Sequence, residues 1–149
     1  MDKFHDLSVG SRLTGKSAPI TFTRTRWYEE GIRYAGDANV KQVSTNIHTS
    51  HDYARNQGLP AAIADGMLTT QWCSNMLFEY FGMHYLERGE LRTKFIKPVY
   101  IDRVNSVFGT VLSIDKQADG DTLYTMDIWS EDETGLKLTD GHATVRVTG

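Results

Sequence analysis

The sequence is poor in residues that cross-link or interrupt a fold. It has one cysteine, Cys73, and three prolines among 149 residues. A single cysteine cannot form a disulfide within the chain, which excludes the class of small secreted disulfide scaffolds and fits a reducing compartment. We therefore expect a cytoplasmic protein. The prolines are widely separated, and no repeat or linker divides the chain.

Long hydrophobic runs and a strong charge of one sign are also missing. No stretch reaches the roughly 18 apolar residues of a membrane span, and residues 1–16 lack the apolar core of a signal peptide. The 16 Lys and Arg nearly balance the 19 Asp and Glu, giving a net charge of −3. The basic residues are scattered, unlike those of a nucleic-acid-binding protein. We expect no membrane or nucleic-acid partner.

The chain does have enough apolar residues for one core. Hydrophobic residues make up 40% of the sequence and aromatic residues 11%. A domain of this length buries about 68 to 70% of its unfolded surface, so it needs no metal or disulfide for stability. We expect a single domain over residues 1–149.

The first half of the chain alternates between short elements and polar loop. Residues 18–23 favour a strand, and residues 26–35 favour a helix with Thr25 as its N-cap and Gly36 at its end. Residues 37–64 are polar and irregular, apart from a short helix expected at 51–56. An irregular stretch of this length is usually functional.

The most hydrophobic helix is expected at residues 66–81. Asp65 is suited to cap it and Gly82 to end it. Apolar residues recur at three- and four-residue steps, which is the helical period. They are Met67, Leu68, Trp72, Cys73, Met76, Leu77, Tyr80 and Phe81. Because they form double columns, we expect most of this helix to be buried.

The rest of the chain favours antiparallel strands. They are expected at residues 90–97, 105–114, 122–129 and 136–147, with turns at 118–121 and 132–135. The turns are too short to contain the helices of a parallel sheet. The fold class is therefore α+β, with a curved antiparallel sheet wrapped around the helix at 66–81.

Three segments of the sequence resemble the motifs of one family. They are residues 34–39 (YAGDAN), residues 46–48 (NIH) with 53–55 (YAR), and residues 61–69 (AAIADGMLT). The first two are similar to the G-D-x-N-P-x-H hydratase motif, and the third to P-I-A-H-G-M-L. A weaker match is residues 95–100 (FIKPVY). The chain thus resembles the MaoC-like dehydratases and (R)-specific enoyl-CoA hydratases, which implies a single hot-dog fold.

The sequence departs from the family pattern between the acid and the histidine. His48 follows Asp37 by eleven residues, where the family has five, and residues 40–45 have the character of an insertion. Without an insertion, Val43 falls on the aspartate position. The motif proline is absent, and Asp65 replaces the histidine that precedes the glycine of the central helix.

The resemblance implies roles for particular residues. Asp37 and His48 would be the acid and base that act on one bound water, and Asn39 and Asn46 would support them. The free N–H groups of Gly66 and Met67, at the positive end of the central helix, would bind an enolate oxygen. The plainer alternatives are that Asp37 is a loop cap and His48 a solvated side chain.

Other candidate residues have ordinary explanations beside functional ones. Asp65 is most simply an N-cap whose carboxylate faces the backbone. His48, His51 and Asp52 are spaced for a metal site, but no second cluster supplies the other ligands, so we expect no metal. Trp27, Tyr28 and Tyr34 either line an acyl pocket or pack in the core.

Three functions remain open from the sequence. The first is an acyl-thioester hydro-lyase that hydrates a trans-2-enoyl-CoA or dehydrates the (R)-3-hydroxyacyl-CoA. The second is a hot-dog acyl-CoA thioesterase that uses Asp65 or Glu79, and the third is a catalytically degenerate acyl-CoA-binding partner subunit. The substrate would be an acyl-CoA or acyl-carrier thioester, with coenzyme A part of the substrate and no other cofactor. A homodimer or higher homo-oligomer is expected.

Overall fold

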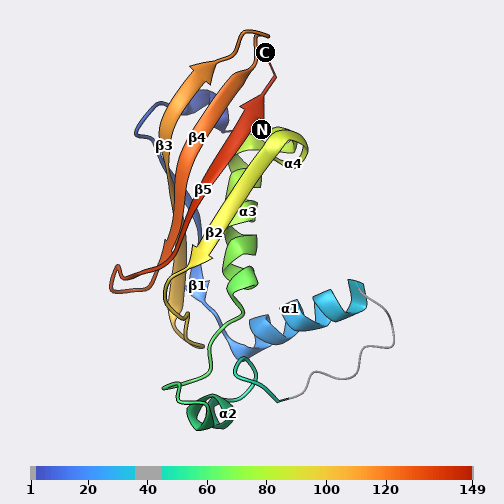
Figure 1. The fold of residues 1–149 in the computed structure, drawn as a ribbon, viewed down its shortest axis with the longest axis vertical. Coiled ribbons are helices and arrows are strands. Elements are labelled where there is room, and N and C mark those ends of the chain that lie inside the picture. Colours follow the sequence, from blue (N-terminus) through green and yellow to red (C-terminus); the bar gives the residue numbers. More distant parts are fainter. Residues whose placement is uncertain (1–2, 36–44, 149) are drawn as a thin grey trace.

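Five antiparallel strands form one sheet in a computed structural model of the chain, which describes residues 3–35 and 45–148 (Figure 1). The strands are β1 (Arg12–Pro19), β2 (Gly89–Phe95), β3 (Val104–Lys116), β4 (Thr122–Glu131) and β5 (Lys137–Val147). The helices are α1 (Phe22–Ala35), α2 (His51–Asn56), α3 (Gly66–Phe81) and α4 (Met83–Arg88), and a 3-10 turn (Phe4–Asp6) precedes β1.

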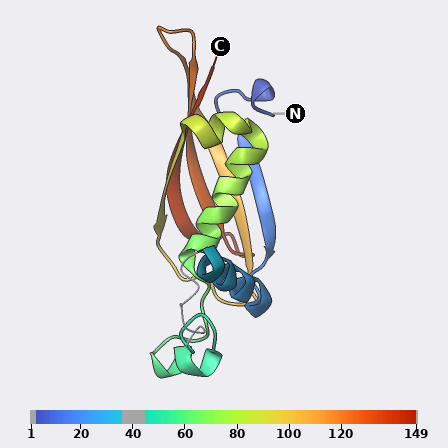
Figure 2. The ribbon, with the colours of Figure 1, turned by 90° about the vertical axis from the view of Figure 1, so that its right-hand side faces the viewer.

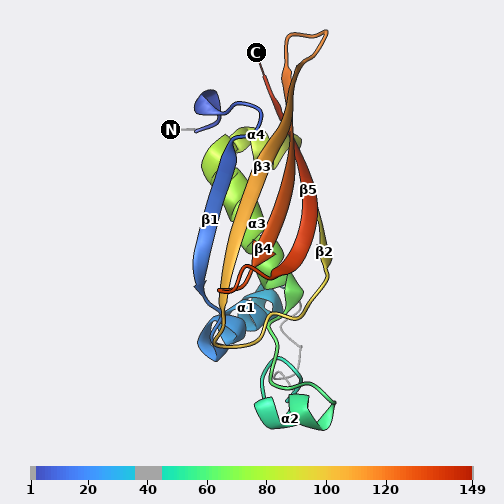
Figure 3. The same ribbon diagram turned by 90° about the vertical axis from the view of Figure 1, so that its left-hand side faces the viewer.

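The sheet wraps around α3, as the sequence predicts. The strand order is β1-β3-β4-β5-β2, and every pairing is antiparallel. Strands β3, β4 and β5 follow one another through short turns, whereas β2 crosses over to pair with β5. Figure 2 shows α3 lying across one face of the sheet, and Figure 3 shows the strands in front of it. The expected α+β class is confirmed.

Alternating side chains explain how the sheet holds the helix. Along β4 the burial alternates, with Tyr124, Met126 and Ile128 buried and Asp127 exposed on the opposite face. Because successive side chains of a strand point to opposite faces, one apolar face is available to cover α3. Val107 and Val111 of β3 continue that buried face.

Helix α3 has the bounds that its caps and apolar period predict. The Asp65 side chain accepts a hydrogen bond from the Met67 N–H, and Gly82 ends the helix with a φ of 55°. Its buried residues include Leu68, Trp72, Cys73, Met76, Leu77 and Phe81. One stripe remains outside the core, where Met67 is 51% and Phe78 45% exposed. Most of the apolar arc is buried, as expected.

Two predicted elements were misplaced, and helix α4 and the 3-10 turn at Phe4–Asp6 were missed. Strand β1 begins at Arg12, not at residue 18, and α1 begins at Phe22, so Thr25 lies inside the helix and does not cap it. Strand β1 is a polar edge strand in which Leu13 is the buried residue, so it has little apolar alternation. Helix α4 was missed because it is one short segment directly after Gly82.

Helices α1 and α2 lie at one end of the sheet, and the described chain ends lie at the other (Figure 1). Phe22 of α1 packs edge to face on His51 of α2, with ring centroids 4.9 Å apart. None of the helices in the described part of the chain is long and apolar enough to cross a membrane. Of the segments that resemble family motifs, residues 46–48 and 95–100 are both hydrogen-bonded to residues 61–64, just before α3.

A charged cluster joins α4, β4 and β5 at the end of the sheet near the C-terminus. Asp121 accepts hydrogen bonds from Arg146 Nε at 2.7 Å and from Arg88 Nη1 at 2.8 Å. The bond from Arg146, with the charge of Arg88, lowers the pKa of the Asp121 carboxyl below its ordinary value. A carboxyl with a lowered folded pKa stabilises the fold above its unfolded pKa, and this stabilisation is lost as the pH falls.

We therefore expect Asp121→Asn to be less stable than the native protein at pH 7, because the asparagine has no charge to pair with Arg88 and Arg146. The difference should shrink from about pH 5 downward and be lost as the pH falls through the lowered pKa of the native carboxyl, which is then protonated. Urea unfolding at several pH values measures this, with Asp52→Asn as the exposed-pair control. A difference that does not change with pH would contradict the cluster's role.

Candidate active site

Residues 62–64 form a short strut that leads into α3. On one side, the Ala64 N–H donates to the Val99 carbonyl at 2.7 Å, and the Ile101 N–H donates to the Ala62 carbonyl at 3.0 Å. These bonds, together with an antiparallel bridge at Ile63, join the strut to the segment before β3. The strut thereby holds the start of α3 next to the segment that leads into β3.

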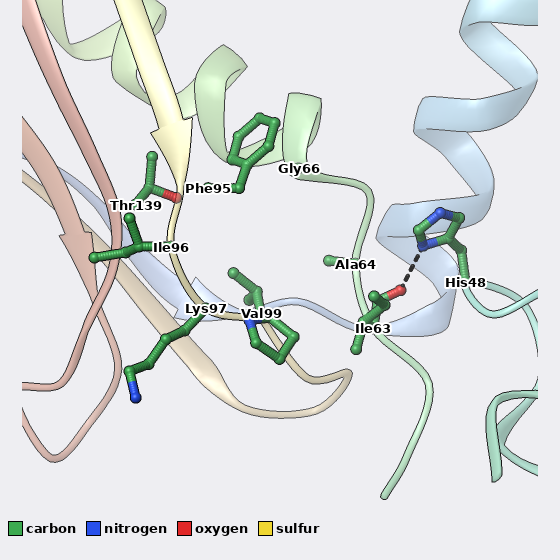
Figure 4. Close-up of a pocket in the computed structure, with 10 residues that line it drawn as sticks. His48, Ile63, Ala64, Gly66, Phe95, Ile96, Lys97, Val99 and Thr139 are labelled. Carbon is green, nitrogen blue, oxygen red and sulfur yellow. Dashed lines mark hydrogen bonds between the residues drawn. The ribbon is translucent and has the colours of Figure 1, made fainter. Parts of the chain in front are cut away.

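The other side of the strut holds His48. The Ile63 N–H donates to the Ile47 carbonyl at 3.1 Å, and the His48 Nδ1 lies 2.8 Å from the Ile63 carbonyl oxygen (Figure 4). Because a carbonyl oxygen only accepts, Nδ1 carries the proton in this contact. The neutral imidazole then has its lone pair on Nε2, which is the arrangement of a general base.

Asn46 holds the backbone of His48 in place. Its side-chain Oδ1 accepts a hydrogen bond from the His48 N–H at 2.7 Å, and its own N–H donates to Thr49 Oγ1 at 2.9 Å. This is an Asx turn, in which a short polar side chain fixes the backbone two residues onward. Asn46 thus supports His48 through the main chain.

A cavity of about 340 Å³ lies between His48 and the end of β2. The residues that line it include His48, Ile63, Gly66, Phe95, Lys97 and Val99 (Figure 4). Its walls are mainly apolar, and the first residue of α3 forms part of them. A cavity with apolar walls and few polar groups is the usual form of a small-molecule site.

The N-terminus of α3 presents its first residue to this cavity. The Met67 N–H donates to Asp65 Oδ1 at 2.8 Å, so the carboxylate faces the backbone as predicted and the Met67 donor is occupied. A Cβ on Gly66 would lie 2.7 Å from the Phe95 ring. The glycine therefore makes room for the ring, and its position at a helix N-terminus favours negative charge nearby.

The remaining sequence candidates with described positions do not line this cavity. Asp37 and Asn39 fall outside the described residues. His51 Nδ1 accepts a hydrogen bond from the Ala62 N–H at 3.1 Å, and Asp52 pairs with Arg55. Within residues 3–35 and 45–148, no three His, Cys, Asp or Glu side chains gather as a metal site. Burial raises the pKa of the Cys73 thiol to about 12, which suits packing and not nucleophilic attack.

A second apolar cavity, of about 440 Å³, lies between α1 and α3. Trp27 and Tyr28 of α1 face Leu68 and Trp72 of α3 across it. Tyr34, the third aromatic residue expected in an acyl pocket, is 80% exposed and is not part of this lining.

Helix α1 brings two ionisable side chains to the same region. They are Tyr28, which the sequence offers for an acyl pocket, and Glu29, which the sequence does not single out. Partial burial raises the pKa of the Glu29 carboxyl above its ordinary value. The charge of Asp65 also raises this pKa, whereas the charge of His48 lowers it. Burial also raises the pKa of Tyr28, again with a contribution from Asp65. Glu29 follows Phe22 and Arg26 at helical steps, so the three side chains share one face of α1. This spacing is the sequence signal that places Glu29 on the face that meets His48.

No family model matches the sequence, and no curated protein resembles it in sequence. Solved structures resemble it in fold. The (R)-hydratase from A. caviae involved in PHA biosynthesis has a TM-score of 0.73 at 16% identity, over 95% of this chain and 98% of that one. A MaoC-like dehydratase from Rhodospirillum rubrum has a TM-score of 0.70 at 17% identity, over 97% and 94%.

The same fold occurs in a complex of different chains. A chain of the HadBC (3R-hydroxyacyl-ACP dehydratase) complex from Mycobacterium tuberculosis has a TM-score of 0.66 at 12% identity, over 93% of this chain and 96% of that one. The architecture is therefore the hot-dog fold. Its form is the one found in MaoC-like dehydratases and (R)-hydratases, as the sequence motifs predict.

The contact between Gly66 and Phe95 yields a stability prediction. We expect Gly66→Ala to lower the free energy of unfolding by about 1 to 3 kcal/mol, because the new methyl group overlaps the ring. Adding Phe95→Ala should then cost less than it does in the native protein, because the overlap is gone. Urea unfolding of the four proteins of this cycle measures the coupling. Additive effects would show that the ring does not require the glycine.

Proposed function

We propose that the protein is an acyl-thioester hydro-lyase, which adds water to a trans-2-enoyl thioester or removes it from the (R)-3-hydroxyacyl form. The observation that carries this proposal is the hydrogen bond from His48 Nδ1 to the Ile63 carbonyl, because it puts the lone pair of the neutral imidazole on Nε2, and His48 lines the cavity at the start of α3. The likeness in fold to an (R)-hydratase and to dehydratases supports the same reaction.

The chemistry needs three groups, and we assign them as follows. His48 Nε2 takes a proton from water as the water oxygen bonds to C3 of the substrate. The electrons of the double bond move towards the thioester oxygen, where the Gly66 N–H at the N-terminus of α3 stabilises the negative charge. An acid delivers a proton to C2. Asp37 is the acid that the resemblance implies, with Asn39 and Asn46 in support.

The cavity also suggests how the thioester is held. The apolar side chains of Ile63, Phe95 and Val99 would contact the acyl group, and Lys97 lies at the same cavity with a positive charge. We propose that the carrier is coenzyme A or an acyl carrier protein, which extends outward past Lys97. Coenzyme A would then be part of the substrate, and no further cofactor is needed for this reaction.

We propose that two hot-dog units pair, with a second copy of this chain as the partner. Strands β1 and β2 are the outer strands of the sheet, and an unpaired edge invites pairing. Exposed Met67 and Phe78 add an apolar stripe on α3. The HadBC complex is an assembly of different chains, so a distinct partner is the other outcome of an oligomeric-state measurement.

Thioester hydrolysis is less well supported by the positions of the carboxylates. Asp65 is bonded to the Met67 N–H, and Glu79 lies exposed in the last turn of α3, far along the helix from Gly66. Neither is placed to direct water at a thioester carbonyl beside His48. Products separate the two reactions, because hydrolysis releases a free thiol.

We expect His48→Ala to lower the turnover of enoyl-CoA hydration by about 100-fold or more, because it removes a positioned base. The assay follows the loss of enoyl absorbance on a panel of enoyl-CoA thioesters, with free thiol monitored in the same sample. His142→Ala, an exposed histidine of β5, is the matched control. Release of free thiol would identify a thioesterase. If the native protein changes neither the enoyl absorbance nor the free thiol, a binding subunit would be favoured.

The acid assigned by resemblance has its own test. We expect Asp37→Asn to lower hydration by about 100-fold while leaving the unfolding curve unchanged, because asparagine cannot donate or accept a proton at this site. Steady-state kinetics with the substrate from the His48 assay measures it. A fully active Asp37→Asn protein would rule out Asp37 as the acid.

A further inference from the structure

The inner face of the sheet carries buried side-chain oxygens that have no hydrogen-bond partner among the described residues. They are Asn105 Oδ1 of β3, Ser130 Oγ of β4 and Thr139 Oγ1 of β5. None of these three residues is more than 1% exposed. A polar group buried without a partner is costly, and such groups are nearly always satisfied by protein or by ordered water. Each of the three oxygens therefore needs an explanation.

Of these three residues, only Thr139 lines the cavity that His48 and Gly66 also line. Within the sheet, Thr139 pairs with Phe95 of β2 on one side and with Ser130 of β4 on the other. Directly opposite residues of paired strands point to the same face, so the three side chains form one row. Figure 4 shows the Thr139 hydroxyl directed towards Phe95. Thr139 thus offers an unpaired hydroxyl to a molecule in the cavity.

The surroundings of this hydroxyl favour a neutral polar group. Phe95, Ile96 and Val99 give this end of the cavity apolar walls. Lys97 also lines the cavity, but Figure 4 shows its ammonium group pointing away from Thr139. A charged group would lose its hydration here without gaining a counter-charge. A threonine hydroxyl can donate one hydrogen bond and accept another, so a neutral amide would suit it.

The proposed reaction determines which part of the substrate reaches Thr139. Figure 4 shows His48 at one end of the cavity, Thr139 at the other and Gly66 between them. With C3 beside His48 and the thioester oxygen at the Gly66 N–H, the sulfur and its carrier continue towards Thr139. In coenzyme A and in acyl carrier proteins this sulfur belongs to a pantetheine arm. The first polar group of the arm beyond the sulfur is a neutral amide.

We propose that the Thr139 hydroxyl binds the first amide of the pantetheine arm and so holds the thioester in register with Gly66 and His48. This inference rests on the proposed hydro-lyase function and deepens it, because it names the substrate class as pantetheine thioesters. Thr139 is a binding residue and takes no part in proton transfer. Because coenzyme A and acyl carrier proteins share this amide, the contact is the same with either carrier.

The first test removes the hydroxyl from the protein. Thr139→Val has nearly the same shape, and we expect kcat/KM for hydration of trans-2-butenoyl-CoA to fall about tenfold. The free energy of unfolding should be unchanged or higher, because a buried unpaired polar group is lost. Thr139→Ser keeps the hydroxyl and should recover most of the activity.

Ser130→Ala is the matched control, because it removes the neighbouring buried hydroxyl, which does not line the cavity. This variant should keep the native kcat/KM. A Thr139→Val protein that keeps the native kcat/KM, or a Ser130→Ala protein that loses as much of it as Thr139→Val does, would overturn the inference.

The second test removes the amide from the substrate. The trans-2-butenoyl thioester of N-acetylcysteamine retains the first amide of the arm, and the S-pentyl thioester replaces it with methylene groups. We expect the native protein to favour the amide-bearing thioester about tenfold in kcat/KM, and Thr139→Val to lose this preference. The S-pentyl thioester should be hydrated equally by both proteins. Equal losses with both thioesters would indicate a structural role for Thr139 and overturn the inference.

The two carriers provide a third comparison. Because they share the amide, Thr139→Val should lower kcat/KM by the same factor with butenoyl-CoA and with a butenoyl acyl carrier protein. The higher native kcat/KM identifies the carrier that the protein uses. A loss confined to one carrier would contradict a contact with the shared amide.

The outcomes distinguish this inference from the proposed function. If the native protein hydrates butenoyl-CoA and His48→Ala does not, the hydro-lyase function holds, and the results with Thr139 decide the inference alone. If the native protein hydrates no thioester, the proposed function fails and the inference fails with it.

Discussion

The short strut at residues 62–64 is the constraint on which the site depends. Its backbone bonds to residues 99–101 on one side and to Ile47 and His48 on the other. Because the strut runs directly into Asp65 and the first turn of α3, one short segment sets the distance between His48, the proposed base, and the helix terminus. A loop carrying a histidine would otherwise have many conformations, so these few hydrogen bonds supply the positioning that the proposed catalysis requires.

The buried helix gives that strut a rigid base. Leu77 and Phe81 anchor α3 inside the curved sheet, so its N-terminus projects towards the end where α1 and α2 lie (Figure 1). Asp65 brings a negative charge close to a place where negative charge would develop. Its hydrogen bond to the Met67 N–H turns that carboxylate to the backbone and leaves Gly66 facing the cavity. The cap and the proposed oxyanion site thus use neighbouring groups of one helix end.

Local signals explain which parts of the fold the sequence predicts. Helices at 51–56 and 66–81 have caps and a clear period, and β3 to β5 have alternation and turn residues, so their bounds are close to those expected. Strand β1 is polar, and the pairing of β2 with β5 depends on a crossover that no local pattern encodes. In the site, the motif predicts His48 and Asn46 beside Gly66, but Glu29 and Phe95 come from distant segments. Their approach follows from tertiary packing, which spacing alone does not reveal.

The most direct measurement is proton NMR of trans-2-butenoyl-CoA incubated with the native protein in deuterium oxide. The account predicts that the vinyl signals disappear, that a hydroxyl-bearing carbon forms at C3 with the R configuration, and that one deuterium enters C2 while the thioester stays intact. That result would place water addition and proton delivery on the two carbons that the site is proposed to serve. Release of free coenzyme A with the double bond unchanged, or an unaltered substrate, would contradict it.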